Sequence, residues 1–227
     1  MEEVVAVVVD NGEPMLERCV ESLRDQSMPV RVVIAAGPRT DMELARSLAD
    51  EVVGPAEGIG RARVEAILST SEEYILSCDS DTVYHPMSAE AAVKALRLFP
   101  AVRAGTVLPH QGEESWLGLL EGLLATKLFC YEFSLAFRRD AFISAGIHEV
   151  NYEAPRADIG PHVCARLLPV PVPDMVCWTR LPTNYARRLV TDYAYPIAGA
   201  AIPVAVASGV VAAREVPKIL DRIFGRS

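Results

Sequence analysis

Continuous runs of apolar residues alternate along the chain with segments in which apolar residues recur every three or four positions. Residues 4–9 and 31–36 consist almost entirely of Val, Ala and Ile, which is typical of strands buried on both faces. Between them, apolar side chains have the spacing of a helix that packs one face against a core, at Met15, Leu16, Cys19, Val20 and Leu23. This alternation predicts βαβ units and a mostly parallel sheet covered by helices.

The same pattern continues through the first hundred residues. We expect helices over residues 41–49 and 60–68, and strands over residues 51–53 and 73–78. The later part of the chain is less regular. There the pattern predicts strands over 101–108 and around 134–138, and helices over 115–131, 139–145 and 158–168.

Composition narrows the class of protein. The 227 residues carry 22 Lys and Arg against 30 Asp and Glu, a net charge of −8, so a cationic nucleic-acid-binding protein is not expected. Five cysteines without C-x-x-C spacing argue against a zinc ribbon or a disulfide framework and favour a reducing compartment. No secretory signal is visible in the opening residues. We therefore expect a cytoplasmic location, with the cytoplasmic face of the membrane as an option.

The C-terminal tail differs from the rest of the chain. Residues 176–227 carry seven basic and three acidic side chains, whereas the first 175 residues carry a net charge of −12. Residues 195–213 are uncharged, but they are rich in Ala and Gly and contain Pro196 and Pro203. Three interpretations stay open for this stretch: a packed core helix, an in-plane or hairpin membrane anchor, and a membrane span. We expect contact with a membrane surface through residues 195–226.

The strongest chemical signal is Asp79-Ser80-Asp81, directly after the strand expected over 73–78. The carboxyl ends of parallel strands are where open α/β sheets bind ligands. Paired carboxylates there suit Mg²⁺ or Mn²⁺, which share the rest of their coordination shell with water and substrate phosphates. The alternative is a polar turn in which one Asp caps the next helix.

Three further blocks accompany this motif. They are Asn11-Gly12-Glu13-Pro14 after the first strand, Gly58-Ile59-Gly60-Arg61-Ala62-Arg63, and Phe137-Arg138-Arg139-Asp140-Ala141-Phe142 with Gly146. In order and spacing, over about residues 3–165, the blocks resemble the family 2 inverting glycosyltransferases, which have the nucleotide-sugar-binding GT-A fold. The resemblance implies a GT-A-like, mostly parallel central α/β sheet flanked by helices, with a C-terminal helical tail.

The resemblance also implies a domain organisation. A catalytic domain would span residues 1–190, with a nucleotide-sugar-binding half over 1–100 and an acceptor half over 101–190. The helical tail would follow over residues 191–227.

The implied activity is metal-dependent, inverting transfer of a sugar from a UDP- or GDP-sugar to a saccharide or lipid-linked acceptor, at a hydroxyl or a lipid phosphate. Asp158 would be the catalytic base, and Arg138 and Arg139 would bind the acceptor. Asp79 and Asp81 would hold Mg²⁺ or Mn²⁺. The donor-binding residues would be Asp10, Asn11, Glu13, Arg63, Asp79 and Asp81.

Departures from the family pattern keep alternatives open. Ala35-Ala36 stands where the family has an acidic pair that meets the nucleotide base, and Ala157-Asp158 stands where it has Glu-Asp. Asp158 could instead be the N-cap of the following helix, and Arg63 could lie on a solvated helix face. Arg138 and Arg139 could be surface charges. A nucleotidyltransferase acting on sugar phosphates and a non-catalytic nucleotide-sugar-binding relative are the rival functions.

Overall fold

The computed structural model describes residues 4–110, 131–152 and 158–179, which all belong to one compact unit, Met1–Leu181. The helix expected over 115–131 lies almost entirely outside these ranges. The expected tail over 191–227, with its uncharged stretch at 195–213, lies outside them altogether. Within the described ranges, no helix is long and apolar enough to cross a membrane.

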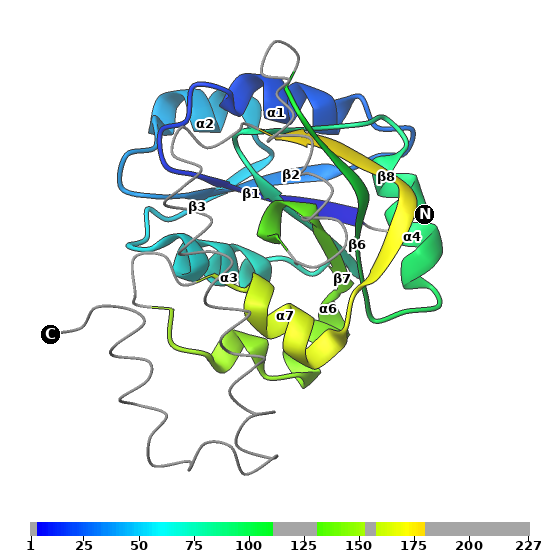
Figure 1. The fold of residues 1–227 in the computed structure, drawn as a ribbon. Helices are drawn as coiled ribbons and strands as arrows, with labels where there is room; N and C mark the ends of the chain where they lie inside the picture. Colours follow the sequence, from blue (N-terminus) through cyan, green and yellow to red (C-terminus); the bar gives the residue numbers. More distant parts are fainter. Residues whose placement is uncertain (1–3, 111–130, 153–157, 180–227) are drawn as a thin grey trace, which may run out of the picture. The chain divides into compact units, whose positions relative to one another are not determined.

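A single eight-stranded sheet organises the described residues, in the order β3-β2-β1-β4-β7-β6-β8-β5 (Figure 1). Strands β3, β2, β1 and β4 are parallel to one another, and β6 is parallel to β8. Strand β7 runs antiparallel to β4 and β6, and β5 runs antiparallel to β8. The sheet is therefore mostly parallel, as expected. The strands are β1 Val4–Asp10, β2 Arg31–Ala36, β3 Glu51–Val53, β4 Tyr74–Asp79, β5 Thr82–Tyr84, β6 Ala101–Pro109, β7 Leu135–Arg138 and β8 Val170–Thr179.

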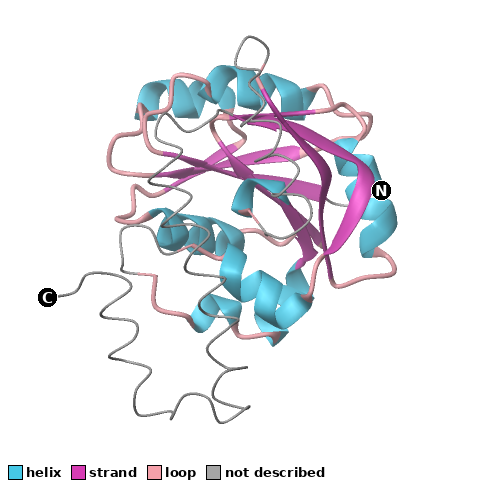
Figure 2. Cartoon of the chain, viewed as in Figure 1, coloured by secondary structure: helices cyan, strands magenta, loops and turns pink. Residues whose placement is uncertain are grey.

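Helices cover both faces of this sheet (Figures 1 and 2). One apolar core contains residues of α1, α2 and α4, and the other contains residues of α3, α6 and α7. The helices are α1 Leu16–Arg24, α2 Met42–Leu48, α3 Ile59–Ser69, α4 Ser88–Leu96, α6 Arg139–Ser144 and α7 Gly160–Leu167, with short 3₁₀ turns η1 Glu132–Ser134 and η2 Ile147–Glu149. The helices expected over 41–49, 60–68, 139–145 and 158–168 are thus confirmed to within two residues at each end.

Strand β1 explains why the opening run is continuously apolar. Val4, Ala6 and Val8 lie in the core with α1, whereas Val5, Val7 and Val9 lie in the core with α3. Because successive side chains of a strand point to opposite faces, a strand in the middle of a two-sided sheet needs apolar residues at every position.

The structure adds elements that the apolar pattern does not reveal, namely β5, α4 and β8. Strand β8 contains Pro171 and Pro173, which lack the backbone N–H that a central strand normally donates. It nevertheless pairs with β6, through a register shift between Ala104 and Thr106. Gly105 lies at this shift, where a Cβ atom would be 2.5 Å from the carbonyl oxygen of Val172. The close approach of the two backbones at Gly105 therefore accompanies the irregular pairing.

The cysteines do not all have the same state. Cys19, Cys78 and Cys177 are free and buried. Cys164 is disulfide-bonded, so it does not support the inference of a reducing compartment from the spacing of the cysteines.

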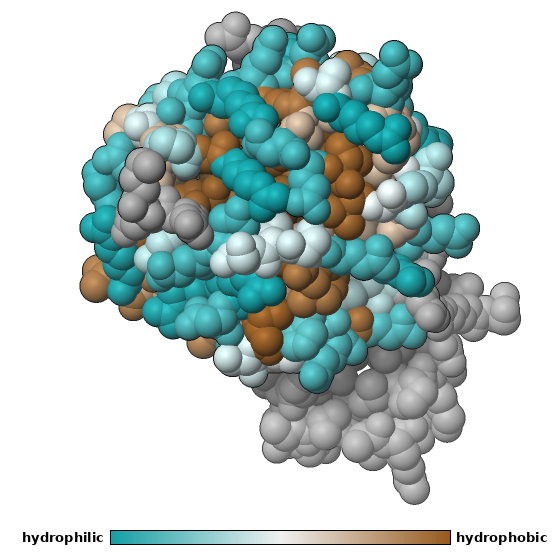
Figure 3. All heavy atoms as spheres, turned by 180° about the vertical axis from the view of Figure 1, so that it is seen from behind, coloured by the Kyte–Doolittle hydropathy of each residue, from teal (hydrophilic) through white to brown (hydrophobic). Residues whose placement is uncertain are grey.

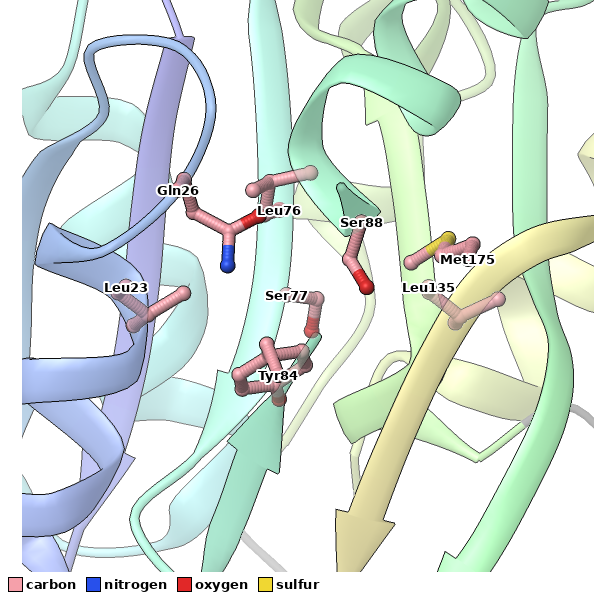
Figure 4. Close-up of a pocket in the computed structure, with 8 residues that line it drawn as sticks. All are labelled: Leu23, Gln26, Leu76, Ser77, Tyr84, Ser88, Leu135 and Met175. Atoms are coloured by element: carbon pink, nitrogen blue, oxygen red, sulfur yellow. The ribbon is translucent and has the colours of Figure 1, made fainter. Parts of the chain in front are cut away.

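A small apolar cavity lies inside the core, between α1, β4, α4 and β8 (Figure 4). It has room for about one water molecule. Its polar lining side chains already have partners: the Gln26 amide donates to the carbonyl oxygens of Ser22 and His85, and the Ser88 hydroxyl donates to that of Val176. This cavity is a packing void, not a substrate site. Its lining residues are Leu23, Gln26, Leu76, Ser77, Tyr84, Ser88, Leu135 and Met175.

Apolar patches also occur between hydrophilic side chains on the face seen from behind (Figure 3). Among the described residues, the most exposed large apolar side chains are Leu98 and Leu168. They precede β6 and β8, and therefore lie toward the amino-terminal ends of these two strands.

Candidate active site

Acidic side chains gather where β1 and β4 end. The two strands are parallel neighbours, and Val9 pairs with Asp79, so Asp10 and Asp79 lie side by side at the same edge of the sheet. Asp81 follows in the turn between β4 and β5. We call this group, Asp10, Asp79 and Asp81, the acidic edge. It lies where open α/β sheets bind ligands.

Arg63 of α3 is fully buried behind the acidic edge. Its Nε donates to Asp158 Oδ1 (2.9 Å), and its Nη2 donates to Asp158 Oδ2 (3.0 Å) and Asp79 Oδ1 (2.6 Å). Its Nη1 donates to Ser77 Oγ and to the carbonyl oxygen of Cys78, both at 2.9 Å. A guanidinium has five N–H donors, and all five are therefore used within the protein.

These contacts revise the role expected for Arg63. A donor diphosphate would reach the guanidinium only by displacing a carboxylate, so direct donor binding by Arg63 has no support in this geometry. The alternative of a solvated helix face is wrong, because the side chain is fully buried. Burial acts to lower the pKa of Arg63, but the charges of Asp158 and Asp79 outweigh it and raise the pKa, so the side chain stays cationic.

Asp158 is brought to the acidic edge by this same guanidinium. The residue lies just before α7, whose N-cap is Ile159, so the alternative role of Asp158 as the helix N-cap is not realised. Its Oδ1 also accepts the Ile159 N–H at 2.7 Å, and its side chain is 13% exposed. Asp158 and Asp79 are thus held together by Arg63, although Arg63 and Asp158 are 95 positions apart in the sequence.

The loop after β1 uses its polar side chains to hold its own backbone. Asp10 is buried, and its two carboxylate oxygens accept the N–H groups of Gly12 and Glu13. Asn11 Oδ1 accepts the Arg39 N–H at 3.2 Å. Asp10 and Asn11 therefore shape the loop that borders the acidic edge, and Glu13 lies in that loop.

Two residues of the acidic edge, Asp79 and Asp81, supply carboxylate oxygens, the type of ligand that Mg²⁺ and Mn²⁺ prefer. Asp81 Oδ1 accepts from the hydroxyl of Thr82 (3.3 Å), and His110 Nε2 lies 3.0 Å from the carbonyl oxygen of Asp81. In the part of the chain that the structure describes, no three His, Cys, Asp or Glu side chains are arranged to hold a metal ion by themselves. Mg²⁺ and Mn²⁺ suit such a partial set, because water and phosphate oxygens complete their shells.

Arg138 and Arg139 lie elsewhere. Arg138 pairs with Tyr74 at the start of β4, and the Arg139 N–H donates to the carbonyl oxygen of Glu73. Asp79 ends β4 five residues later, about 16 Å along the strand. The structure does not bring these arginines to the acidic edge, so their expected role in acceptor binding has no support in it. Arg138 instead forms an ion pair with Asp140 at 3.3 Å.

Sequence reasoning missed one residue of the site, Glu132 in η1. Burial raises its pKa to about 8, and the charges of Asp158 and Asp79 add to this, whereas that of Arg63 opposes it. The charges that act on Glu132 are thus those of Arg63, Asp79 and Asp158. Its only signal in the sequence is a lone acid between two aromatic residues, directly before the strand expected around 134–138.

The sheet with its acidic edge defines the class of protein, an α/β fold of the GT-A type. Residues 4–146 match the sequence model of glycosyl transferase family 2, and the chain belongs to this family. The resemblance of the four sequence blocks to this family is therefore confirmed. No curated protein matches the chain.

Solved structures share the fold at low sequence identity. S. aureus TarS 1-349 in complex with UDP-GlcNAc has a TM-score of 0.57 at 17% identity, over 80% of this chain and 59% of that one. The mannosyltransferase PcManGT from Pyrobaculum calidifontis, in complex with GDP-Man and Mn²⁺, has a TM-score of 0.56 at 20% identity, over 86% of this chain and 64% of that one. For the crystal structure of S. aureus TarS, the TM-score is 0.55 at 16% identity, over 83% of this chain and 38% of that one. The chain thus spans less than two thirds of the length of each of these structures.

Proposed function

We propose that the protein transfers a sugar, with inversion, from a nucleotide-sugar donor to an acceptor hydroxyl or lipid phosphate, with the help of a divalent cation. The observation that carries this proposal is the cluster at the end of β4, where Arg63 holds Asp79 and Asp158 together beside Asp81. Family membership supports glycosyl transfer. The bound UDP-GlcNAc and GDP-Man of the two structural neighbours support a nucleotide-sugar donor.

Asp81 and Asp79 would hold the cation, Mg²⁺ or Mn²⁺. When bound, such an ion neutralises the negative charge that develops on a departing nucleoside diphosphate. Mn²⁺ in the neighbouring mannosyltransferase supports this choice. Asp79 Oδ1 accepts an Arg63 N–H and Asp81 Oδ1 accepts from the Thr82 hydroxyl, so an ion would share both carboxylates with partners inside the protein.

Asp158 would be the catalytic base, which takes the proton of the acceptor hydroxyl as that oxygen attacks the sugar. Arg63 and the Ile159 N–H fix the orientation of its carboxylate through three hydrogen bonds. A base that is held in this way needs little reorganisation when the acceptor arrives.

Recognition of the nucleotide base would differ from the family pattern. Strand β2 ends in Ala35 and Ala36, which are fully buried and bear no carboxylate. The loops after β1 and β2 meet beside this strand end: the Arg39 N–H donates to Asn11 Oδ1, and the Thr40 hydroxyl donates to the carbonyl oxygen of Asp10. UDP-sugars and GDP-sugars are therefore both candidate donors.

The proposal is tested by a thermal-shift panel of UDP-, GDP- and dTDP-sugars with and without Mn²⁺, followed by turnover measurements on the donors that bind. We expect stabilisation by one nucleotide class in the presence of Mn²⁺, and loss of turnover in EDTA. The anomeric configuration of the product, read by NMR, reports on inversion.

The matched variants are Asp81→Ala at the acidic edge and Asp140→Ala at the far end of the sheet. We expect turnover to fall by about 10²-fold or more in Asp81→Ala and to stay unchanged in Asp140→Ala. Full activity in EDTA, or in Asp81→Ala, would contradict the metal-dependent mechanism.

A further inference from the structure

The Asp79-Ser80-Asp81 turn joins two parts of the sheet that are not neighbours. Three strands, β7, β6 and β8, lie between β4 and β5 in the sheet, yet only Ser80 and Asp81 connect β4 to β5 along the chain. In a flat sheet β4 and β5 would be about 19 Å apart, whereas the chain from Asp79 to Thr82 can span at most about 11 Å. The sheet therefore curves until β5 lies close to the end of β4, and the turn crosses this junction.

The first two residues of the turn are held from the β4 side of the junction. The Cys19 thiol of α1 donates to the carbonyl oxygen of Asp79 at 3.4 Å. The Ser80 N–H donates to the carbonyl oxygen of Val9 in β1 at 3.0 Å. The backbone of Asp79 and Ser80 is thus attached to the parallel strands β1 and β4 and to the helix that packs on them.

Asp81 is held from the other side of the junction, by His110. Pro109, the last residue of β6, pairs with Thr179 of β8, and Thr179 pairs in turn with Thr82 of β5. This pairing brings His110, directly after β6, beside the turn. The His110 side chain is buried, and its Nε2 lies 3.0 Å from the carbonyl oxygen of Asp81. Because a carbonyl oxygen can only accept, Nε2 carries the hydrogen of this bond.

The His110 hydrogen bond affects how the two carboxylates of the turn are spaced. Asp79 ends β4, whereas the carbonyl group of Asp81 is attached to the residue after β6. The bond limits the rotation of the Asp81 backbone, and the Asp81 side chain moves with that backbone. Removal of a group that orients a metal ligand typically weakens metal binding by about 10-fold or more.

We propose that His110 is a positioning residue for the divalent cation: its Nε2–H holds the Asp81 backbone, so that the Asp81 carboxylate keeps a fixed place relative to that of Asp79. This inference rests on the proposed function, because it requires a cation at the acidic edge. In this role His110 contacts neither the cation nor the substrate. An N–H donor of the same reach should therefore replace it.

The test compares His110→Gln with His110→Asn. The side-chain N–H of Gln reaches the place of His Nε2, whereas that of Asn, one carbon shorter, reaches only the place of His Nδ1. Electron paramagnetic resonance measures Mn²⁺ binding in the presence of UDP or GDP, with Mn²⁺ and nucleotide alone as the blank. We expect His110→Asn to weaken Mn²⁺ binding by about 10-fold or more, and His110→Gln to stay within about 2-fold of wild type.

Turnover and thermal unfolding provide independent readouts. A weaker cation site raises the Mn²⁺ concentration that gives half-maximal turnover, and excess Mn²⁺ should restore most of kcat in His110→Asn. A role in folding alone would instead lower the melting temperature of the metal-free protein and leave Mn²⁺ affinity unchanged. The matched control is His148→Asn in η2, where the histidine lies 3.8 Å from Glu149, and it should bind Mn²⁺ like wild type.

Three outcomes overturn the inference. If His110→Asn binds Mn²⁺ as wild type does, the hydrogen bond to Asp81 does not determine the cation site. If His110→Gln is as impaired as His110→Asn, the imidazole ring itself is needed, and His110 acts in another way than through the Asp81 carbonyl group. If both variants lose their thermal transition, the role of His110 is in folding. A wild-type protein that binds no Mn²⁺ with either nucleotide overturns the proposed metal-dependent function itself.

Discussion

Arg63 is the residue on which the candidate active site depends most. Its guanidinium group binds both Asp79, at the end of β4, and Asp158, before α7. The remaining N–H donors bind Ser77 and Cys78 of β4. A buried ion pair of this kind adds little net stability compared with an apolar pair, but the removal of one partner leaves a charge without compensation. Arg63 therefore acts as a positioning residue.

Replacement of Arg63 by Met tests this dependence. Asp79 and Asp158 would lose their cation, so we expect the free energy of unfolding to fall by about 3 kcal/mol or more. Urea-induced unfolding measures this difference. The matched control is Arg61→Met on the same helix, where a 57% exposed side chain pairs with Glu65 and the loss should stay below about 1 kcal/mol. Equal losses in the two variants would contradict the assignment.

Asp158→Asn separates proton abstraction from positioning. Asn keeps one oxygen that can accept from Arg63 but cannot take the proton of an acceptor. We expect kcat to fall by about 10²–10⁴-fold, with donor affinity nearly unchanged. Steady-state kinetics and calorimetric donor binding measure the two effects, with Asp140→Asn as a control. An equal collapse of donor affinity would show that Asp158 binds the donor or holds the fold.

The raised pKa of Glu132 makes the stability of the protein depend on pH. The folded protein keeps this proton up to about pH 8, whereas the unfolded chain releases it near pH 4.5. The unfolding free energy should therefore fall as pH rises between these values, by up to about 1.4 kcal/mol per pH unit. Urea unfolding measures this free energy for wild type and Glu132→Gln at pH values between about 5.5 and 8.5, which cover most of this titration. The unfolding free energy of the variant should depend less on pH than that of wild type.

The comparison of the two proteins cancels the contributions of other groups. Burial, with help from Arg166, lowers the pKa of His162, so His162 makes stability rise with pH near its ordinary pKa in both proteins. Parallel profiles for wild type and Glu132→Gln would mean that Glu132 ionises normally in the folded state.

At the scale of elements, the pairing of β6 with β8 attaches the last two strands, β8 and β5, to the rest of the sheet. Strand β8 lies between β6 and β5, and Gly105 lies where the register of β6 and β8 shifts. The contact there is between backbone atoms, which have little freedom to move. The sheet thus depends on a residue without a side chain at this position.

Gly105→Ala should accordingly destabilise the protein. A Cβ atom would meet the carbonyl oxygen of Val172 at 2.5 Å and the Pro173 Cα at 2.6 Å. We expect a loss of about 1–3 kcal/mol, measured by thermal or urea unfolding. Thr106→Ala, at the next position of the same strand, is the control and should cost less than about 1 kcal/mol. A Gly105→Ala variant as stable as wild type would show that β8 can move away from β6.

At the scale of the whole molecule, we predict that the uncharged stretch at 195–213 brings the protein to a membrane surface. The stretch is flanked by Arg187 and Arg188 before it and by Arg214, Lys218, Arg222 and Arg226 after it. Acidic lipid head groups attract such cations by about 1 kcal/mol each close to a membrane surface. Apolar side chains within the stretch would add to this attraction.

Liposome co-sedimentation tests this prediction. We expect the full chain to bind anionic vesicles, binding to weaken with added salt, and truncation after Asp192 to abolish it while the remaining protein stays folded. A truncated protein that unfolds would instead assign the stretch to the core. If the full-length protein does not bind anionic vesicles, the prediction of membrane contact is wrong.

The amino-acid sequence by itself determined the βαβ architecture of residues 4–79 and the place of Asp79-Ser80-Asp81 at the end of a strand. Both features depend on local information, because buried strands and amphipathic helices have periods of a few residues, and a motif next to a strand moves with that strand. The strands at 4–9, 31–36, 51–53 and 73–78 are accordingly found in the structure to within one residue at each end.

Only the tertiary structure decided which polar groups meet. Arg63 lies in a helix whose sequence permits a solvated face, yet it is buried because Asp158, 95 positions later, and Asp79 compensate its charge. Strand β8 contains prolines that argue against a strand, but β6 accepts it where Gly105 lets the two backbones approach. The charges that raise the pKa of Glu132 likewise come from distant segments, at Asp79 and Asp158. Long-range contacts of this kind leave no periodicity in the sequence, so no local pattern predicts them.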